Sequence, residues 1–303
     1  MKFFLHYGNF FVRKKIKIID IITGEKPSLS FEVFPPKTYS TFDSIKTASE
    51  NIAALKPSYM SVTYGAGGGT SEFTVSIAQN IQKKYGVTAL AHLTCVNSTK
   101  EEVRMRLEAL KHSGIENILA LRGDVVPGNE NREKWDYHHA NELIEEIKQF
   151  GDFCIGGACY PDGHPESLHQ KDDILNLKKK VDSGCDFLTT QMFFDNNVLY
   201  NYMYKIREAG ITVPIVAGIM PVINAKQIAK SCELSGTYLP QRFKTIIDRY
   251  ADNPEAMKQA GIAYATEQII DLYANGINAV HVYSMNKDDV AKTIQSNISE
   301  IIK

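Results

Sequence analysis

Two carboxylates that follow or interrupt apolar runs are the strongest candidates for chemistry, and the first is Glu32. It lies inside the apolar run LSFEVF of residues 29–34. Burying a carboxylate is costly and favours its neutral form, which can serve as a general acid near neutral pH. Strand alternation places Glu32 on the same side as Ser30 and Phe34. We favour the general acid over the alternative, a buried glutamate held in a structural ion pair.

The second carboxylate, Asp124, ends the run ILALRGD of residues 118–124. Gly123 permits a sharp turn directly after the strand, and Arg122 supplies a fixed cation beside the carboxylate. Asp124 could therefore belong to a site at the end of this strand. It could equally cap the following helix, and the residue alone does not decide between these alternatives.

Further polar residues stand near the ends of most apolar runs. The glycine-rich stretch YGAGGGT (64–70) could bring backbone N–H groups close to an anion, although it matches neither a Rossmann nor a P-loop motif. A plain flexible loop is the alternative. The adjacent histidines His138 and His139 lack a third ligand, so no metal site is predicted. The residues interpreted as one site are Glu32, Thr63, His92, Arg122, Asp124, Tyr160, His164, Gln191 and Tyr283.

These residues need elements that bring strand ends together, and the chain has eight short apolar runs separated by helical, charge-rich stretches. Successive run ends are mostly about 30 residues apart, the length of one strand, one helix and two loops. The pattern predicts an α/β fold, a single-domain (β/α)8 TIM barrel with its site at the C-terminal strand ends. A doubly wound sheet is the competing fold. The runs are 29–34, 59–64, 89–95, 118–122, 153–160, 187–194, 213–220 and 279–283.

Departures from the even spacing define the predicted domain boundaries. Residues 1–20 are assigned to a loosely held N-terminal extension, and residues 21–303 to the barrel. The long interval before the eighth run predicts a helical insertion, with an extra helix near 242–250 ahead of the one near 262–274. A last helix is predicted over 288–303. Glycines are expected to end the helices shortly before the next strand. They are Gly114, Gly184, Gly210 and Gly276.

Composition sets the class of protein. The formal net charge of −1 gives no reason to expect a nucleic-acid partner, and no apolar run approaches the length of a membrane-spanning helix. Five scattered cysteines, an odd number without a C-x-x-C pair, argue against a disulfide framework or a zinc ribbon. Reduced thiols fit a cytoplasmic location.

Nine stretches, in order from about residue 28 to 290, closely resemble the methylenetetrahydrofolate reductase family. A single stretch would be weak support, whereas nine in the same order are strong. They are 30–37 (SFEVFPPK), 61–70 (SVTYGAGGGT), 91–94 (AHLT), 119–124 (LALRGD), 160–167 (YPDGHPES), 176–184 (NLKKKVDSG), 190–195 (TQMFFD), 218–222 (GIMPV) and 281–286 (HVYSMN).

The resemblance implies a (β/α)8 barrel that binds FAD noncovalently and works by a ping-pong mechanism. NADH or NADPH would reduce the flavin and leave. The small-molecule substrate 5,10-methylenetetrahydrofolate would then take the hydride and become 5-methyltetrahydrofolate, which feeds methionine synthesis. Members of the family commonly form homo-oligomers, so a homo-oligomer is expected.

The resemblance also implies roles for individual residues. Glu32 matches the acid that helps to open the folate five-membered ring, and Asp124 the carboxylate near flavin and pterin that stabilises the resulting cation. Gln191, Gln227 and Lys287 match folate contacts, Gln191 serving the nicotinamide nucleotide as well. The cofactor contacts implied are Thr63, Tyr64, His92, Arg122, Gly123, Asp124, Ala140, Tyr160, His164, Ser167, Asp173, Asn176, Lys179 and Lys180.

The sequence departs from the family's pattern in three places. Bacterial relatives often have arginine where Lys287 stands, and an aromatic residue of some relatives is missing near Ser231. Both departures concern contacts to the folate tail. The C-terminal regulatory domain of animal members is not in this sequence, so we expect no inhibition by S-adenosylmethionine.

Other functions remain open on the sequence alone. Another flavin-dependent barrel oxidoreductase, such as a proline-dehydrogenase-like enzyme, would bind FAD without turning over the folate. A barrel lyase or aldolase would need a metal cluster or a lysine at a strand end, and no lysine lies inside the eight runs. A non-enzymatic binding barrel would leave Glu32 unexplained.

Overall fold

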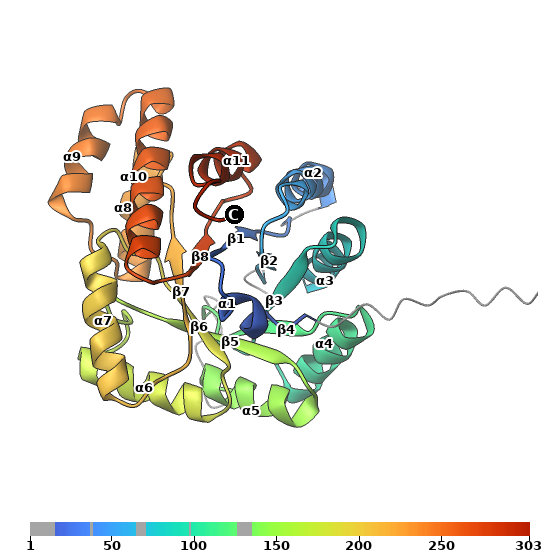
Figure 1. The fold of residues 1–303 in the computed structure, drawn as a ribbon. Helices are drawn as coiled ribbons and strands as arrows, with labels where there is room; N and C mark the ends of the chain where they lie inside the picture. The colour runs from blue at the N-terminus through green and yellow to red at the C-terminus, as the bar shows by residue number, and fades with distance from the viewer. Residues whose placement is uncertain (1–15, 37–38, 65–70, 97, 126–134) are drawn as a thin grey trace, which may run out of the picture.

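Eight parallel strands pair in sequence order and close on themselves in the computed structural model (Figure 1), which describes residues 16–36, 39–64, 71–96, 98–125 and 135–303. This closure confirms the predicted (β/α)8 barrel and excludes the doubly wound sheet, whose edges stay open. The strands are β1 (Ser28–Val33), β2 (Tyr59–Val62), β3 (Thr88–Thr94), β4 (Asn117–Leu121), β5 (Cys154–Cys159), β6 (Phe187–Thr190), β7 (Ile215–Ile219) and β8 (Ala279–Val282).

Each strand carries two different faces because successive side chains point to opposite sides. On β1, Phe31 and Val33 belong to the large core between the barrel and its helices. The alternating residues Ser30 and Glu32 are also buried, and their contacts are with residues of neighbouring strands inside the barrel. This explains why the strands are apolar nearly throughout, with polar residues at a few inward positions.

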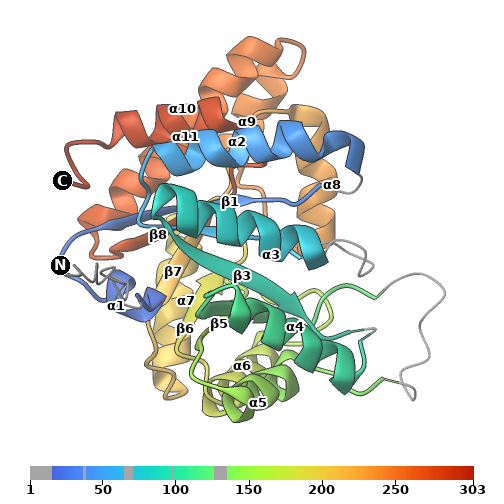
Figure 2. The same cartoon turned by 90° about the vertical axis from the view of Figure 1, so that its right-hand side faces the viewer.

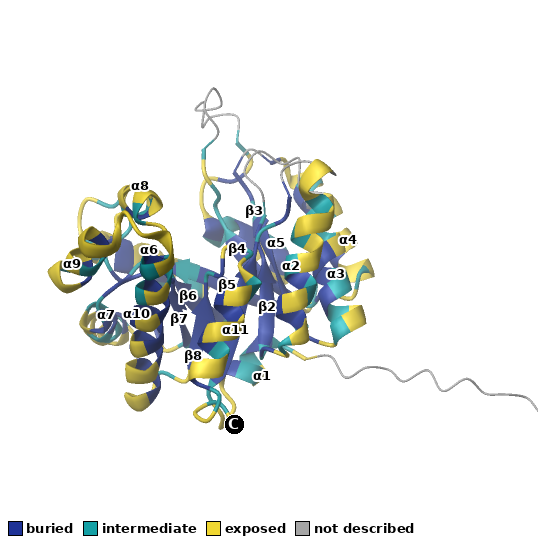
Figure 3. Ribbon diagram, turned by 90° about the horizontal axis from the view of Figure 1, so that it is seen from above, coloured by how far each residue is buried: buried dark blue, intermediate teal, exposed yellow. Residues whose placement is uncertain are grey.

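Helices surround the barrel and turn their exposed faces outwards (Figure 3). All four glycines predicted to end helices have φ between 76° and 110°, the left-handed region that lets the chain leave a helix sharply. The helices are α2 (Phe42–Ala54), α3 (Ser71–Asn80), α4 (Lys100–His112), α5 (Ala140–Phe150), α6 (Gln170–Asp182), α7 (Asn196–Glu208), α8 (Ala225–Ser235), α9 (Gln241–Tyr250), α10 (Pro254–Ala274) and α11 (Asp288–Asn297), with the short turns η1 (Tyr39–Thr41) and η2 (Ile81–Tyr85).

A short helix, α1 (Ile18–Ile22), closes the end of the barrel at which the strands begin. Ile18 is completely buried, and its N–H donates to Asn117 Oδ1 at 2.8 Å. Figure 2 shows α1 at the opposite end of the barrel from α8. The predicted boundary at residue 20 stays a prediction, although Ile18 and Ile22 of α1 pack with strand residues and form the floor of the barrel. Residues 1–15 lie outside the described residues.

The insertion before β8 consists of α8, α9 and the first part of α10. The predicted helices near 242–250 and 262–274 are confirmed as α9 and α10. Helix α8 was not predicted, because Ile228 is its only fully buried residue and the apolar periodicity is correspondingly weak. Phe243 and Tyr264 stack at 3.9 Å between ring centroids in a second core that joins α9 to α10.

Helix α10 approaches the backbone after β7 at Gly261. A Cβ atom on Gly261 would lie 1.8 Å from the carbonyl oxygen of Val222, far inside van der Waals contact. Only glycine permits this approach without a shift of one backbone or the other. In the described part of the chain, no helix is long and apolar enough to cross a membrane.

Candidate active site

A cavity of about 1090 Å³ opens at the carboxyl ends of β3, β4 and β5 and beside the first turns of α5 and α6. Its position agrees with the usual location of active sites in this fold. Twelve of the fourteen expected cofactor contacts line it. The remaining two are buried, Thr63 directly after β2 and His92 within β3. The twelve are Tyr64, Arg122, Gly123, Asp124, Ala140, Tyr160, His164, Ser167, Asp173, Asn176, Lys179 and Lys180.

The turn after β4 directs Asp124 to the cavity. Gly123 has φ 88°, and a Cβ atom there would lie 2.9 Å from the Cβ atom of Thr94. A side chain at this position is therefore disfavoured twice, by conformation and by space. The predicted sharp turn is confirmed, and it leaves Asp124 exposed on the cavity wall.

Helix α6 contributes two cations and one unsatisfied acid to the lining of the cavity. Lys180 Nζ donates to the carbonyl oxygen of Ala158 at 2.6 Å, and burial lowers the pKa of Lys180 from its usual value. Lys179 Nζ lies 3.4 Å from Asn176 Oδ1. Asp173 Oδ2 is buried without a hydrogen-bond partner among the described residues, and burial raises the pKa of Asp173. These groups offer positive charge to a diphosphate and a free acceptor to a hydroxyl group.

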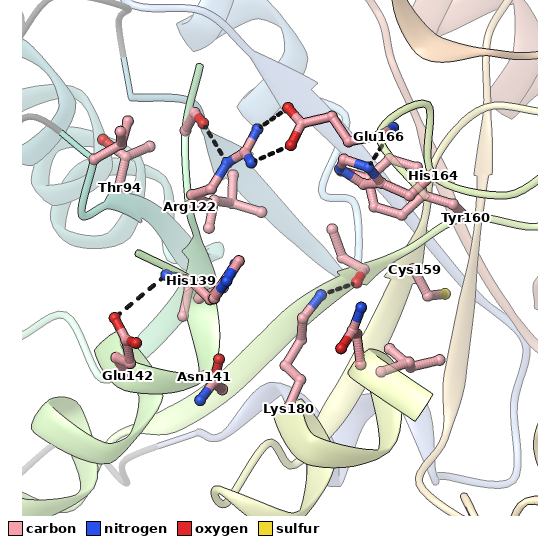
Figure 4. A pocket seen from close by; sticks show the side chains of 18 of the residues that line it. Thr94, Arg122, His139, Asn141, Glu142, Cys159, Tyr160, His164, Glu166 and Lys180 are labelled. Carbon is pink, nitrogen blue, oxygen red and sulfur yellow. Dashed lines mark hydrogen bonds and ion pairs between the residues drawn. The ribbon is translucent and has the colours of Figure 1, made fainter. Parts of the chain in front are cut away.

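An ion pair spans the wall of the cavity between β4 and the loop after β5. The guanidinium of Arg122 makes two hydrogen bonds of 2.6 Å to the carboxylate of Glu166 (Figure 4). This bidentate pairing raises the pKa of Arg122 further. Glu166 was not among the predicted site residues, because nothing in the sequence links it to an arginine 44 positions away.

Two aromatic rings from the same loop border the cavity beside this ion pair. Tyr160 and His164 contact each other edge to face, with ring centroids 4.5 Å apart. Burial raises the pKa of Tyr160 to about 12 and lowers that of His164. Both rings are therefore neutral at neutral pH and provide flat, polarisable surfaces for a ligand.

Glu32 lies at the mouth of the barrel interior with only 6% of its surface exposed. Ser61 Oγ donates to its Oε2 at 3.4 Å, and His92 Nε2 lies 3.5 Å from the same atom. Burial lowers the pKa of His92 to about 4, so at neutral pH this contact is not an ion pair. Among the described residues no lysine or arginine pairs with Glu32. This argues against the alternative that Glu32 is held in a structural ion pair.

Below Glu32, His281 joins two serines across the barrel interior. Its Nδ1 lies 2.7 Å from Ser30 Oγ and its Nε2 lies 2.9 Å from Ser61 Oγ, while Ser30 Oγ donates to the carbonyl oxygen of Val280. The ring also stacks on Tyr59 at 5.6 Å. Sequence reasoning missed His281 as a site residue. Strand alternation in AVHVY could have found it, because His281 faces the same side as Tyr283.

The three expected folate contacts lie outside the set that lines the cavity. Gln191 follows β6, and its Oε1 accepts the N–H of Met192 at 2.9 Å. Gln227 is exposed on the first turn of α8, and Lys287 is exposed directly before α11. Tyr283, at the end of β8, donates to the carbonyl oxygen of Thr190 at 2.5 Å. The three expected contacts therefore lie on segments after β6, β7 and β8, outside the set of residues that line the cavity at β3 to β5.

Two further sequence expectations concern ligands of other kinds. Among the described residues, no group of three or more histidine, cysteine, aspartate or glutamate side chains is placed to hold a metal ion. All five cysteines are free, and four of them are buried. The glycine-rich stretch after Tyr64, residues 65–70, lies outside the described residues, so its proposed anion contact is not tested.

Comparison with known proteins identifies relatives of this chain. The sequence model of one family, described as methylenetetrahydrofolate reductase, matches residues 17–299. The chain is 35% identical over 298 residues to methylenetetrahydrofolate reductase (NADH) 1 of Zea mays, covering 94% of this chain and 50% of the maize protein. It is also 35% identical over 267 residues to 5,10-methylenetetrahydrofolate reductase of Escherichia coli K12, covering 88% and 89% of the two chains.

The chain thus spans about half the length of the plant relatives that it matches. Among solved structures, an uncharacterised protein from Clostridium thermocellum that binds two copies of 5-methyl-5,6,7,8-tetrahydrofolic acid has a TM-score of 0.63 at 16% identity. The match covers 94% of this chain and all of the other. At that identity the likeness concerns the fold.

Proposed function

The chain belongs to the methylenetetrahydrofolate reductase family, and we propose that it reduces 5,10-methylenetetrahydrofolate to 5-methyltetrahydrofolate with NADH or NADPH by way of bound FAD. The observation that carries the proposal is the placement of an almost completely buried carboxyl group, Glu32, near the carboxyl end of β1, in a barrel whose β3, β4 and β5 ends open into a large cavity lined by Lys179 and Lys180. The binding-barrel alternative gives Glu32 no role, and the lyase alternative lacks the metal cluster, among the described residues, or the lysine inside a strand run that it would need.

The cavity suits FAD in size and in chemistry. Its volume of about 1090 Å³ is slightly above the roughly 300–1,000 Å³ of ligand pockets, which leaves room for a dinucleotide. Lys179 and Lys180 would hold the diphosphate, and the unsatisfied Asp173 Oδ2 would accept a hydrogen bond from a ribose hydroxyl. Bound there, FAD would supply a carrier that accepts a hydride from the nicotinamide nucleotide and releases it to the folate.

Glu32 and Asp124 divide the work on the folate. Glu32 would protonate the ring nitrogen that leaves the methylene carbon when the five-membered ring opens, and Ser61 would accept or donate a hydrogen bond as its charge changes. Asp124, exposed on the cavity wall, would stabilise the positive charge that then develops on the substrate. Gln191, Gln227 and Lys287 would bind the rest of the folate.

Several broader features are part of the same proposal. A folate ligand is consistent with the Clostridium thermocellum protein, whose ligand is the proposed product, although that likeness is one of fold. The product would feed methionine synthesis. We further infer a cytoplasmic location, since the five free cysteines suit a reducing compartment. The homo-oligomer is part of the proposal because the resemblance to the family implies it.

A visible absorption spectrum of the purified protein, before and after anaerobic NADH or NADPH, tests the proposal directly. We expect a flavin spectrum that bleaches with the reduced nucleotide and recovers when methylenetetrahydrofolate is added. Bleaching without recovery would replace the proposal with another flavin-dependent barrel enzyme. A protein that takes up no FAD would return the chain to the lyase or binding-barrel alternatives.

Replacing Asp124 by asparagine should slow reoxidation of the flavin by methylenetetrahydrofolate by about 100-fold, because a neutral amide no longer stabilises the substrate cation. Reduction of the flavin by NADH should change by less than about threefold, since no cation develops in that step. Stopped-flow absorbance measures both half-reactions on the same protein. The exposed Asp136, which caps Lys100 N–H, gives the control Asp136→Asn. Equal losses in the two half-reactions would contradict the assigned role.

A further inference from the structure

The pairing between β1 and β8 continues past the last strand residue through side chains instead of backbone. The backbone register runs from Ser28, opposite Ala279, to Phe31, opposite Val282. Glu32 comes next on β1, so the chain that carries it has lost its backbone partner on this side. The ladder with β2 still pairs Glu32 with Ser61 and Val33 with Val62, so only the edge that faces β8 needs other contacts.

Two side chains of the segment after β8 supply the missing contacts. Ser284 Oγ donates to the carbonyl oxygen of Glu32 at 2.6 Å. Asn286 binds the backbone of Phe34 twice: its Oδ1 accepts the N–H at 2.8 Å, and its Nδ2 donates to the carbonyl oxygen at 3.0 Å. On the opposite side, Thr63 N–H donates to the carbonyl oxygen of Val33 at 3.0 Å. The end of β1 is thus held on both edges.

The same segment sets the position of Lys287. Met285 and Asn286 both adopt left-handed conformations, with φ 51° and 57°, which reverse the chain after β8. Lys287 N–H then donates to the carbonyl oxygen of Ser284 at 2.9 Å and closes the turn. Lys287 stands directly before the first residue of α11. One tight turn therefore contacts the backbone of Glu32 and presents the ammonium group of Lys287.

We propose that Asn286, assisted by Ser284, is a positioning residue that keeps Glu32 and Lys287 in fixed register, so that the acid and a contact for the folate act on one bound substrate. Asparagine suits this role because its amide both donates and accepts, and because it tolerates the left-handed conformation better than most residues. Aspartate could accept the Phe34 N–H but could not donate to the carbonyl oxygen. Glycine would keep the conformation and lose both hydrogen bonds.

This inference rests on the proposed function, and the variant Asn286→Gly tests it. We expect flavin reoxidation by methylenetetrahydrofolate to slow by about 10- to 100-fold, since small misplacements of reacting groups have effects of this size. Flavin reduction by NADH should stay within about threefold of the unaltered protein. A second readout needs neither substrate: the amide hydrogen of Phe34 should exchange faster with solvent, because its acceptor is gone. For Asn286→Asp, the rate of flavin reoxidation and the exchange of the Phe34 amide should lie between those of the unaltered protein and of Asn286→Gly.

Asn275→Ala is the matched control. Asn275 also hydrogen-bonds through its side-chain amide, to Asp271 at the end of α10, but it precedes β8 and lies far in sequence from Glu32. It should leave both half-reactions and the exchange of Phe34 unchanged. If Asn286→Gly behaves like the unaltered protein, the inference fails. If the unaltered protein itself does not reoxidise with methylenetetrahydrofolate, the proposed function fails instead, and the exchange of Phe34 still reports whether Asn286 holds the end of β1.

Discussion

Glu32→Gln is expected to abolish folate reduction while leaving reduction of the flavin by NADH almost unchanged. The amide has the shape of the carboxyl group but cannot deliver a proton, and the loss of a general acid costs about 100- to 10,000-fold in rate. The hydride step from nucleotide to flavin needs no proton from Glu32, so it should change by less than about threefold. The fold should persist, because the amide oxygen can still accept the hydrogen bond from Ser61.

Anaerobic stopped-flow absorbance, one half-reaction at a time, measures both rates. Glu50→Gln is the matched control, since Glu50 is a carboxylate with a purely structural set of contacts: Asn80, Lys84 and Tyr85 all bind it. That variant should lower stability slightly and keep the ratio of the two rates. Parallel losses in both half-reactions of Glu32→Gln would show that Glu32 supports the structure rather than the chemistry.

Gly261→Ala is expected to destabilise the protein by roughly 3 kcal/mol, the upper end of the usual cost of overpacking. In an ordinary helix this change would stabilise by up to about 1 kcal/mol. Here the added Cβ atom would lie 1.8 Å from the carbonyl oxygen of Val222, so α10 and the segment after β7 have to separate. Thermal unfolding should show a decrease in Tm of roughly 5–10 °C.

Gly276→Ala, just after the last residue of α10, is the control that separates the cost of a steric clash from the cost of a left-handed backbone conformation. Gly276 has φ 80°, but a Cβ atom there would meet nothing within 4 Å. Its substitution should therefore cost only about 1–2 kcal/mol, the penalty of a left-handed conformation. A Gly261→Ala protein at least as stable as the unaltered one would mean that α10 does not approach Val222 as closely as the structure indicates.

The barrel and part of the site could be predicted from local sequence because the signals are local. Buried strands require apolar runs, helix ends require glycine at left-handed positions, and a carboxylate such as Glu32 stands out inside an apolar run. Asp124 was found in the same way, since Gly123 marks the turn that presents it. The resemblance to a family added the expected cofactor contacts on α5 and α6, because these residues show no recognisable pattern in the local sequence.

The contacts that the sequence did not predict join residues that are far apart in the chain and meet only when the barrel closes. Glu166 meets Arg122 only because two strand ends are neighbours, and Asn286 meets Phe34 only because β8 returns to β1. Their separations along the chain are 44 and 252 residues. The barrel floor was missed for a related reason. Ile18 belongs to a buried cluster with residues of β2 to β8, and a five-residue helix is too short to show a periodic apolar pattern.

In the proposed mechanism, the apolar floor around α1 would decide the route by which Glu32 recovers a proton. Helix α1 packs on an apolar layer that includes Tyr59, Leu90 and Phe187, and this layer lies between Glu32 and the end of the barrel at which the strands begin. A folate bound at the carboxyl ends of the strands would keep solvent from Glu32. Glu32 would then be reprotonated only after the product leaves, so that product release and reprotonation follow one another in each turnover.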